Sequence, residues 1–186
     1  MTTHFFSPHD APPRWHLSSL YGIERVFQDD HTGCGLACVA MIAGVSYREV
    51  RKFAIDHGIF SSGNDSGVSA DGVMKLLKLF NVDTAIRNSI TNWKRVPQVG
   101  MLGINDSRPH WVVAVRTRED CFLIDPSSHV SQKRRRDFGR ISLIGDAVVV
   151  TKGKGFRPVP QRELFLPPVE FRSAVSHRQY GWVLGI

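Results

Sequence analysis

One stretch decides the fold: Val26-Phe27-Gln28-Asp29-Asp30-His31-Thr32-Gly33-Cys34-Gly35-Leu36-Ala37-Cys38-Val39-Ala40-Met41-Ile42-Ala43-Gly44. A polar loop leads into a nearly uninterrupted run of small and apolar residues, which indicates a buried helix that ends at Gly44. Cys34 falls in the first turn of this helix, where unpaired N–H groups and the helix dipole favour a thiolate. Its position makes Cys34 a candidate nucleophile, although a cysteine in such a helix is more often a packing residue.

Other residues along the chain fit the same chemistry. Gln28, six residues before Cys34, carries an amide that can donate to an oxyanion beside the Cys34 backbone N–H. Two apolar runs follow further on, Arg108-Pro109-His110-Trp111-Val112-Val113-Ala114-Val115 and Cys121-Phe122-Leu123-Ile124-Asp125-Pro126. They predict a hairpin that places His110 and Asp125 at the same end. A nucleophile, a base and an orienting carboxylate thus occur in the order Cys, His, Asp.

Together these motifs resemble the bacteriocin-processing, double-glycine-leader peptidases, a branch of the papain-like cysteine peptidases. The resemblance rests on Gln-x5-Cys-Gly before a small-residue helix, His-Trp-Val-Val-Ala-Val, Leu-Ile-Asp-Pro and Gly-Asp-Ala-Val-Val-Val at 145–150, and it covers 26–150. It implies that the loop at 59–67 borders a substrate cleft. It also implies four roles: oxyanion donor for Gln28, nucleophile for Cys34, general base for His110, and orientation of His110 for Asp125.

The order of elements predicts the fold class. Ser46 and Glu49 form a capping-box pattern before a second helix, and Ser69 precedes a third. Strands are predicted at 82–86, 99–104, 110–116, 121–125 and 141–150. Helices followed by strands predict an α+β fold with a helical half, an antiparallel β-sheet half and the active site between them. The family resemblance implies that this is the papain-like fold. A loop at 105–109 would deliver His110.

The chain of 186 residues suits one domain. We expect an N-terminal extension at 1–25, the peptidase domain at 26–150 and a C-terminal extension at 151–186 packed on the domain. A partner-binding or self-inhibiting tail is the alternative for the C-terminal extension.

The composition excludes several classes of protein. No apolar run approaches the ~20 residues of a membrane span, and the first residues lack the pattern of a secretory signal. We therefore expect a cytoplasmic protein, with signal-independent secretion left open. The three cysteines form no metal-type pairs, so we expect neither a metal nor a cofactor, and we place Cys38 and Cys121 in the core.

The net charge of +7 has its densest source in Lys133-Arg134-Arg135-Arg136. Such a run is most often a solvated loop, but it could also bind an anionic partner. The sequence predicts a cysteine peptidase that hydrolyses a peptide or amide bond in a peptide or protein substrate. Two alternatives stay open: a papain-like toxin or effector acting on RNA, and a non-catalytic peptide-binding module, whose members usually lose the cysteine.

Overall fold

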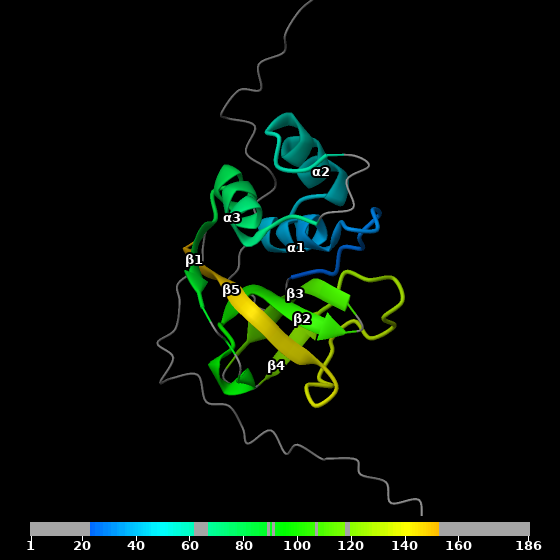
Figure 1. The fold of residues 1–186 in the computed structure, drawn as a ribbon, viewed down its shortest axis with the longest axis vertical. Helices are drawn as coiled ribbons and strands as arrows, with labels where there is room; N and C mark the ends of the chain where they lie inside the picture. The colour runs from blue at the N-terminus through cyan, green and yellow to red at the C-terminus, as the bar shows by residue number, and fades with distance from the viewer. Residues whose placement is uncertain are drawn as a thin grey trace, which may run out of the picture.

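The computed structural model describes residues 23–61, 67–88, 90, 92–106, 108–117 and 120–152. The expected N-terminal extension up to residue 22 and the C-terminal extension after residue 152 lie outside these ranges. Within them, three α-helices are followed by a five-stranded sheet (Figure 1). This order confirms the predicted α+β class. No helix in the described ranges has the length and apolar character needed to cross a membrane.

The helices begin at the residues that the sequence indicated, and α1 ends at Gly44 as predicted. Their bounds are α1 (Cys34–Ala43), α2 (Tyr47–Asp56) and α3 (Ala70–Leu79). After α1, Gly44 has a φ of 66°, in the left-handed region that glycine adopts without a Cβ clash. The Ser46 side chain accepts a hydrogen bond from the Glu49 N–H, and the Ser69 side chain accepts one from the Gly72 N–H. Each such cap stabilises its helix by about 1 kcal/mol.

The strands form one antiparallel sheet in the order β1-β5-β2-β3-β4. The strands, with one short 3-10 helix, are β1 (Asp83–Arg87), η1 (Trp93–Arg95), β2 (Val99–Asp106), β3 (Arg108–Arg116), β4 (Cys121–Ile124) and β5 (Ser142–Lys152). The expected loop at 105–109 is wrong, because Asn105 pairs with Pro109 and Asp106 with Arg108. Proline is tolerated there because a missing N–H costs little near a strand end.

α1 is the centre of the packing, since all of its residues are buried. It packs against α2, α3 and β3, while α3 itself packs against β1 and β5 (Figure 1). Alternation along β3 sends Val113 and Val115 into the core shared with the helices, and Val112 and Ala114 into a second core that also contains Phe138. Cys38 and Cys121 are buried in these two cores, as predicted. The arrangement fixes the start of α1 against the sheet.

Candidate active site

Cys34 is the first residue of α1 and is 9% exposed. Burial opposes ionisation of its thiol and is the largest influence on it. Hydrogen bonds from the His110 ring and the Trp111 backbone, the charge of His110 and the backbone of Gly35 outweigh that effect and lower the pKa of Cys34. The thiolate is therefore favoured at this position.

His110 lies at the end of the β3–β4 hairpin and is also buried. Its Nε2 is 2.8 Å from Asp125 Oδ1, so Nδ1 is the ring nitrogen left to face the Cys34 thiol. Burial acts to lower the pKa of His110, but the hydrogen bonds and charges of Asp125 and Cys34 raise it to about 9. At neutral pH the His110 imidazolium is thus favoured, between the Asp125 carboxylate and a thiol whose pKa is lowered.

Asp125 follows β4 directly and is 1% exposed. Its Oδ1 accepts hydrogen bonds from His110 and from the Ser127 N–H at 2.9 Å. Its Oδ2 accepts one from Arg135 Nη1 at 2.6 Å. Burial acts to raise the pKa of Asp125, but these hydrogen bonds and the charge of His110 lower it. The structure thus brings Cys34, His110 and Asp125 into one hydrogen-bonded chain.

The Gln28 amide is directed into its own loop. Its Nε2 donates to the carbonyl oxygens of Asp30 at 3.0 Å and His31 at 3.1 Å, while its backbone N–H donates to the Pro126 carbonyl at 3.1 Å. Its Oε1 is buried and has no hydrogen-bond partner among the described residues. Both amide hydrogens are therefore occupied, and an oxyanion would have to replace one carbonyl acceptor. The oxyanion role of Gln28 stays a prediction.

The loop before Cys34 is anchored to α2 by side chains that the sequence analysis did not single out. Asp30 Oδ2 accepts hydrogen bonds from Tyr47 Oη at 2.7 Å and from Arg51 Nε at 2.9 Å. A Cβ at Gly33 would lie 1.9 Å from Tyr47 Oη, so only glycine fits against the ring. In the sequence, Gly33 was the only sign of a close contact before Cys34. Sequence spacing does not reveal that Tyr47 of α2 makes this contact.

A cavity of about 350 Å³ opens beside the imidazole of His110. A second histidine, His129, also lines this cavity, but the structure pairs His110 with Asp125. The cavity is lined by His31, Asp106, Arg108, His110, Asp125, Ser127, His129 and Val130.

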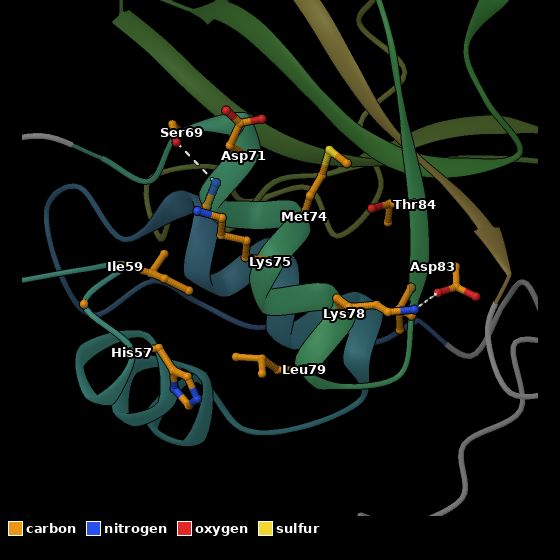
Figure 2. Close-up of a pocket in the computed structure, with 13 residues that line it drawn as sticks. His57, Ile59, Ser69, Asp71, Met74, Lys75, Lys78, Leu79, Asp83 and Thr84 are labelled. Atoms are coloured by element: carbon orange, nitrogen blue, oxygen red, sulfur yellow. Dashed lines mark hydrogen bonds and ion pairs between the residues drawn. The ribbon is translucent and has the colours of Figure 1, made fainter.

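A larger pocket of about 970 Å³ lies along α3 and is lined by none of the four candidate site residues (Figure 2). Gly58 and Ile59 form part of its wall, while 62–66 in the expected cleft loop lie outside the described residues. Lys78 and Asp83 pair at its edge at 2.6 Å. The pocket is thus distinct from the cavity at His110.

The basic run at 133–136 is not simply a solvated loop, and for Arg135 that expectation is wrong. Arg135 is 5% exposed, because its backbone N–H and carbonyl pair with Leu123 at the edge of the sheet. Arg136 donates from Nε to Asp120 Oδ1 at 3.0 Å, and its guanidinium also lies over the Phe122 ring. Arg135 and Arg136 are already paired to carboxylates. The expectation of an anionic partner stays a prediction.

Two arginines next to Asp125 were missed from the sequence. Arg25 Nε donates to the Asp125 carbonyl oxygen at 2.6 Å, and Arg135 donates to its carboxylate. Arg25 falls in the expected N-terminal extension, and Arg135 falls in a run where four neighbouring cations look alike. Only the pairing of Arg135 with Leu123 distinguishes it from the residues beside it.

A solved structure shares this fold. The peptidase domain of Streptococcus ComA, described as a bifunctional ABC transporter in a quorum sensing pathway, is 17% identical, with a TM-score of 0.53; the match covers 69% of this chain and 97% of that chain. A double glycine motif protease from an AMS/PCAT transporter, solved with a leader peptide, is 18% identical over 67% of this chain and 88% of that one, with a TM-score of 0.49. No match was found among curated proteins.

Sequence comparison with known families gives a match over most of the chain. The model of the Peptidase C39 family matches residues 23–152, a range that contains the start of α1, the hairpin and all five strands. It confirms the resemblance derived from the motifs around Cys34, His110 and Asp125. The chain therefore belongs to the Peptidase C39 family and is a cysteine peptidase.

Proposed function

We propose that Cys34, His110 and Asp125 are the catalytic triad of this peptidase, with Gln28 as the oxyanion donor. The observation that carries the proposal is the hydrogen-bonded chain in which Asp125 faces His110 and His110 faces a thiol of lowered pKa. This is the arrangement that activates a cysteine nucleophile.

In the first step, the Cys34 thiolate attacks the carbonyl carbon of a peptide bond. The Cys34 N–H and one N–H of the Gln28 amide donate hydrogen bonds to the resulting oxyanion. To do so, that Gln28 N–H gives up its hydrogen bond to the carbonyl of Asp30 or His31. The His110 imidazolium donates its proton to the departing amine. A thioester to Cys34 and a free amine result.

In the second step, His110 is neutral and accepts a proton from water, which attacks the thioester carbonyl. The tetrahedral intermediate collapses with cleavage of its bond to Cys34, and the carboxylic product leaves. Cys34 is then a thiolate again, and His110 holds the proton from water as an imidazolium. Asp125 keeps the ring oriented in both steps and stabilises its cationic form. These residues alone balance the proton transfers.

The substrate class that follows is a peptide or protein. A segment must place its scissile carbonyl at the start of α1, next to the cavity beside His110. A peptide panel with and without paired glycines before the cleavage position tests whether double-glycine specificity extends to this chain. Cleavage of RNA in place of peptides, dependent on Cys34, would support the toxin alternative instead.

The test of the triad is intact-protein mass after brief treatment with limiting iodoacetamide at pH 6. An ordinary thiol is almost wholly protonated there and reacts slowly. We expect fast single labelling of the wild type, lost in Cys34→Ala and strongly slowed in His110→Ala. Cys121→Ala is the matched control, because burial raises the pKa of Cys121 to about 11. Slow, equal labelling of all four proteins would refute the triad.

A further inference from the structure

Arg135 stands out among the residues around the proposed triad. Its side chain is 6% exposed, and its guanidinium bonds three carboxylates: Asp125 Oδ2 at 2.6 Å, Asp106 Oδ2 at 2.8 Å, and Asp137 at 3.1 and 2.9 Å. A buried guanidinium is stable only with such compensation. The contacts leave its head group one orientation, with Nη1 aimed at Asp125.

The backbone explains why this arginine turns inward. Leu123 in β4 and Arg135 exchange backbone hydrogen bonds of 3.0 and 2.8 Å, so residue 135 lies beside the outer edge of β4. Asp125 is two residues after Leu123 and continues along the same strand direction. The bridge therefore carries the Arg135 side chain to the carboxylate.

The contact with Arg135 gives each carboxylate oxygen of Asp125 a hydrogen-bond donor. Oδ1 faces His110 and the Ser127 N–H, and Oδ2 faces Arg135. Without Arg135, Oδ2 would be a buried oxygen that lacks this charged donor, and the carboxylate could rotate away from His110. The other charged neighbour, Arg25, contacts the main-chain oxygen of Asp125 and cannot replace that bond in its present position.

We propose that Arg135 is a positioning residue for the triad: it holds the Asp125 carboxylate in the orientation that bonds His110 and supplies a buried cation that favours the anionic Cys34. This inference rests on the proposed function, since it assigns a role only if Cys34, His110 and Asp125 act together. This role gives one residue of the basic run at 133–136 a function at the proposed active site.

Charge predicts the direction of the effect. Protonation of the thiolate adds a positive charge to a site that Arg135 already makes more positive. Loss of Arg135 makes that protonation easier, so the acidic limb of Cys34 reactivity moves to higher pH. The charged and titratable groups around this chain include Arg25, Arg135 and Asp106, with Asp137 behind Arg135. The cavity beside His110 adds His31, Arg108 and His129.

The experiment is the pH profile of Cys34 alkylation, from pH 4 to 9, with a thermal melt of each protein. In Arg135→Met we expect the acidic limb to move up by about one pH unit, which slows labelling by up to about tenfold at pH values below the limb. Arg135→Lys restores the charge without the planar fork and should lie between that variant and the wild type. If Arg135→Met does not fold, Arg135→Gln is judged by the same shift.

Two controls separate positioning from general stability. Arg136→Met removes the adjacent cation, which pairs with Asp120, and should leave the limb unchanged. Asp120→Asn removes the carboxylate that pairs with Arg136 and leaves the contacts of Arg135 in place, so it should lower the melting temperature and leave the acidic limb within about 0.3 pH units.

The outcomes also separate this inference from the proposed triad. A wild type that labels no faster than an ordinary thiol refutes the triad itself. A wild type with a reactive Cys34 whose limb moves in Asp125→Asn, but not in the folded Arg135 variants, overturns the role of Arg135 alone.

Discussion

The first and second turns of α1 each carry a cysteine, and the two side chains differ in every property that matters for catalysis. The pKa of Cys34 is lowered, whereas burial, together with the charges of Cys34 and Asp125, raises the pKa of Cys38 well above its ordinary value. Cys34 has the His110 ring as its partner, while Cys38 Sγ faces only the Trp111 carbonyl oxygen at 3.4 Å. One helical turn separates the proposed nucleophile from a packing residue.

This difference shows that a helix start is not sufficient to activate a thiol. Cys34 is itself strongly opposed by burial, and its ionisation depends on a cation supplied by the other half of the fold. The sheet delivers that cation because the β3–β4 hairpin ends at His110 and Asp125. Activation of the Cys34 thiol therefore depends on the contact between α1 and the β3–β4 hairpin.

The largest expected effect is the loss of the first-turn thiol. Cys34→Ala should abolish peptide hydrolysis, lowering kcat/KM by at least about 10⁴-fold, because no other group at the site can form the thioester. The measurement is steady-state cleavage of a peptide substrate, with circular dichroism as the control for folding. If Cys34→Ala were as active as the wild type, Cys34 would not be the nucleophile, and the comparison of Cys34 with Cys38 would be wrong.

The next largest loss of activity is expected from changes in the β3–β4 hairpin, which contacts α1. His110→Ala should lower kcat by about 10²–10⁴-fold, the usual contribution of a general acid–base. Asp125→Asn should cost less, because the amide can still bond the ring through its oxygen. Rates of the two variants on one substrate check this order, and His129→Ala serves as the matched control. A loss in His129→Ala equal to that in His110→Ala would mean that the wrong histidine was chosen.

A smaller effect is expected from the loop before α1. Gln28→Ala should lower kcat by about 10²-fold with little change in KM, since an oxyanion donor acts in the transition state. The kinetic constants of Gln28→Ala and wild type test this. Because the Gln28 amide also bonds the Asp30 and His31 carbonyls, a variant at the anchor, Tyr47→Phe, controls for loosening of the loop. An effect confined to KM would argue against the oxyanion role.

Local patterns were enough to predict much of this molecule. The helix caps at Ser46 and Ser69, the stop at Gly44 and the hairpin that joins His110 to Asp125 all depend on residues close in sequence. These features are readable because helix ends and hairpins are set by neighbouring residues.

What the sequence did not reveal depends on pairing between distant residues. Arg135 turns inward because it bridges to Leu123, and the Gln28 amide is bonded within a loop that α2 anchors. No spacing rule separates Arg135 from Arg136, although one is buried beside Asp125 and the other is exposed beside Asp120. Such partners are decided by tertiary packing and not by local propensity.

The pH dependence of stability sharpens the comparison further. The raised pKa of His110 makes folding take up a proton between pH 6.5 and about 9, whereas the lowered pKa of Cys34 makes folding release one below the ordinary pKa of a thiol, so the two contributions partly offset each other. Cys34→Ala removes the offset. The stabilising effect of protonated His110 is then fully present below pH 6.5 and is lost as pH rises toward its folded pKa.

The expected loss in Cys34→Ala is below about 3 kcal/mol, because the thiolate no longer helps to raise the His110 pKa. Urea unfolding at pH 6 and pH 9 measures the change in the free energy of unfolding. Adding His110→Gln to Cys34→Ala should flatten the dependence. Parallel pH curves for wild type and Cys34→Ala would show that the two residues are not coupled.

The smallest expected effect is at the second turn. Cys38→Ala removes a fully buried sulfur and should lower the free energy of unfolding by about 1 kcal/mol, through lost packing and a weak bond to the Trp111 carbonyl. Labelling of Cys34 at pH 6 and peptide cleavage should change by less than about twofold, because His110 and Asp125 keep their contacts. Chemical denaturation and the alkylation rate measure the two parts separately. If Cys38→Ala slowed alkylation as much as His110→Ala, the second turn would belong to the reactive site, and the division between the two turns would be wrong.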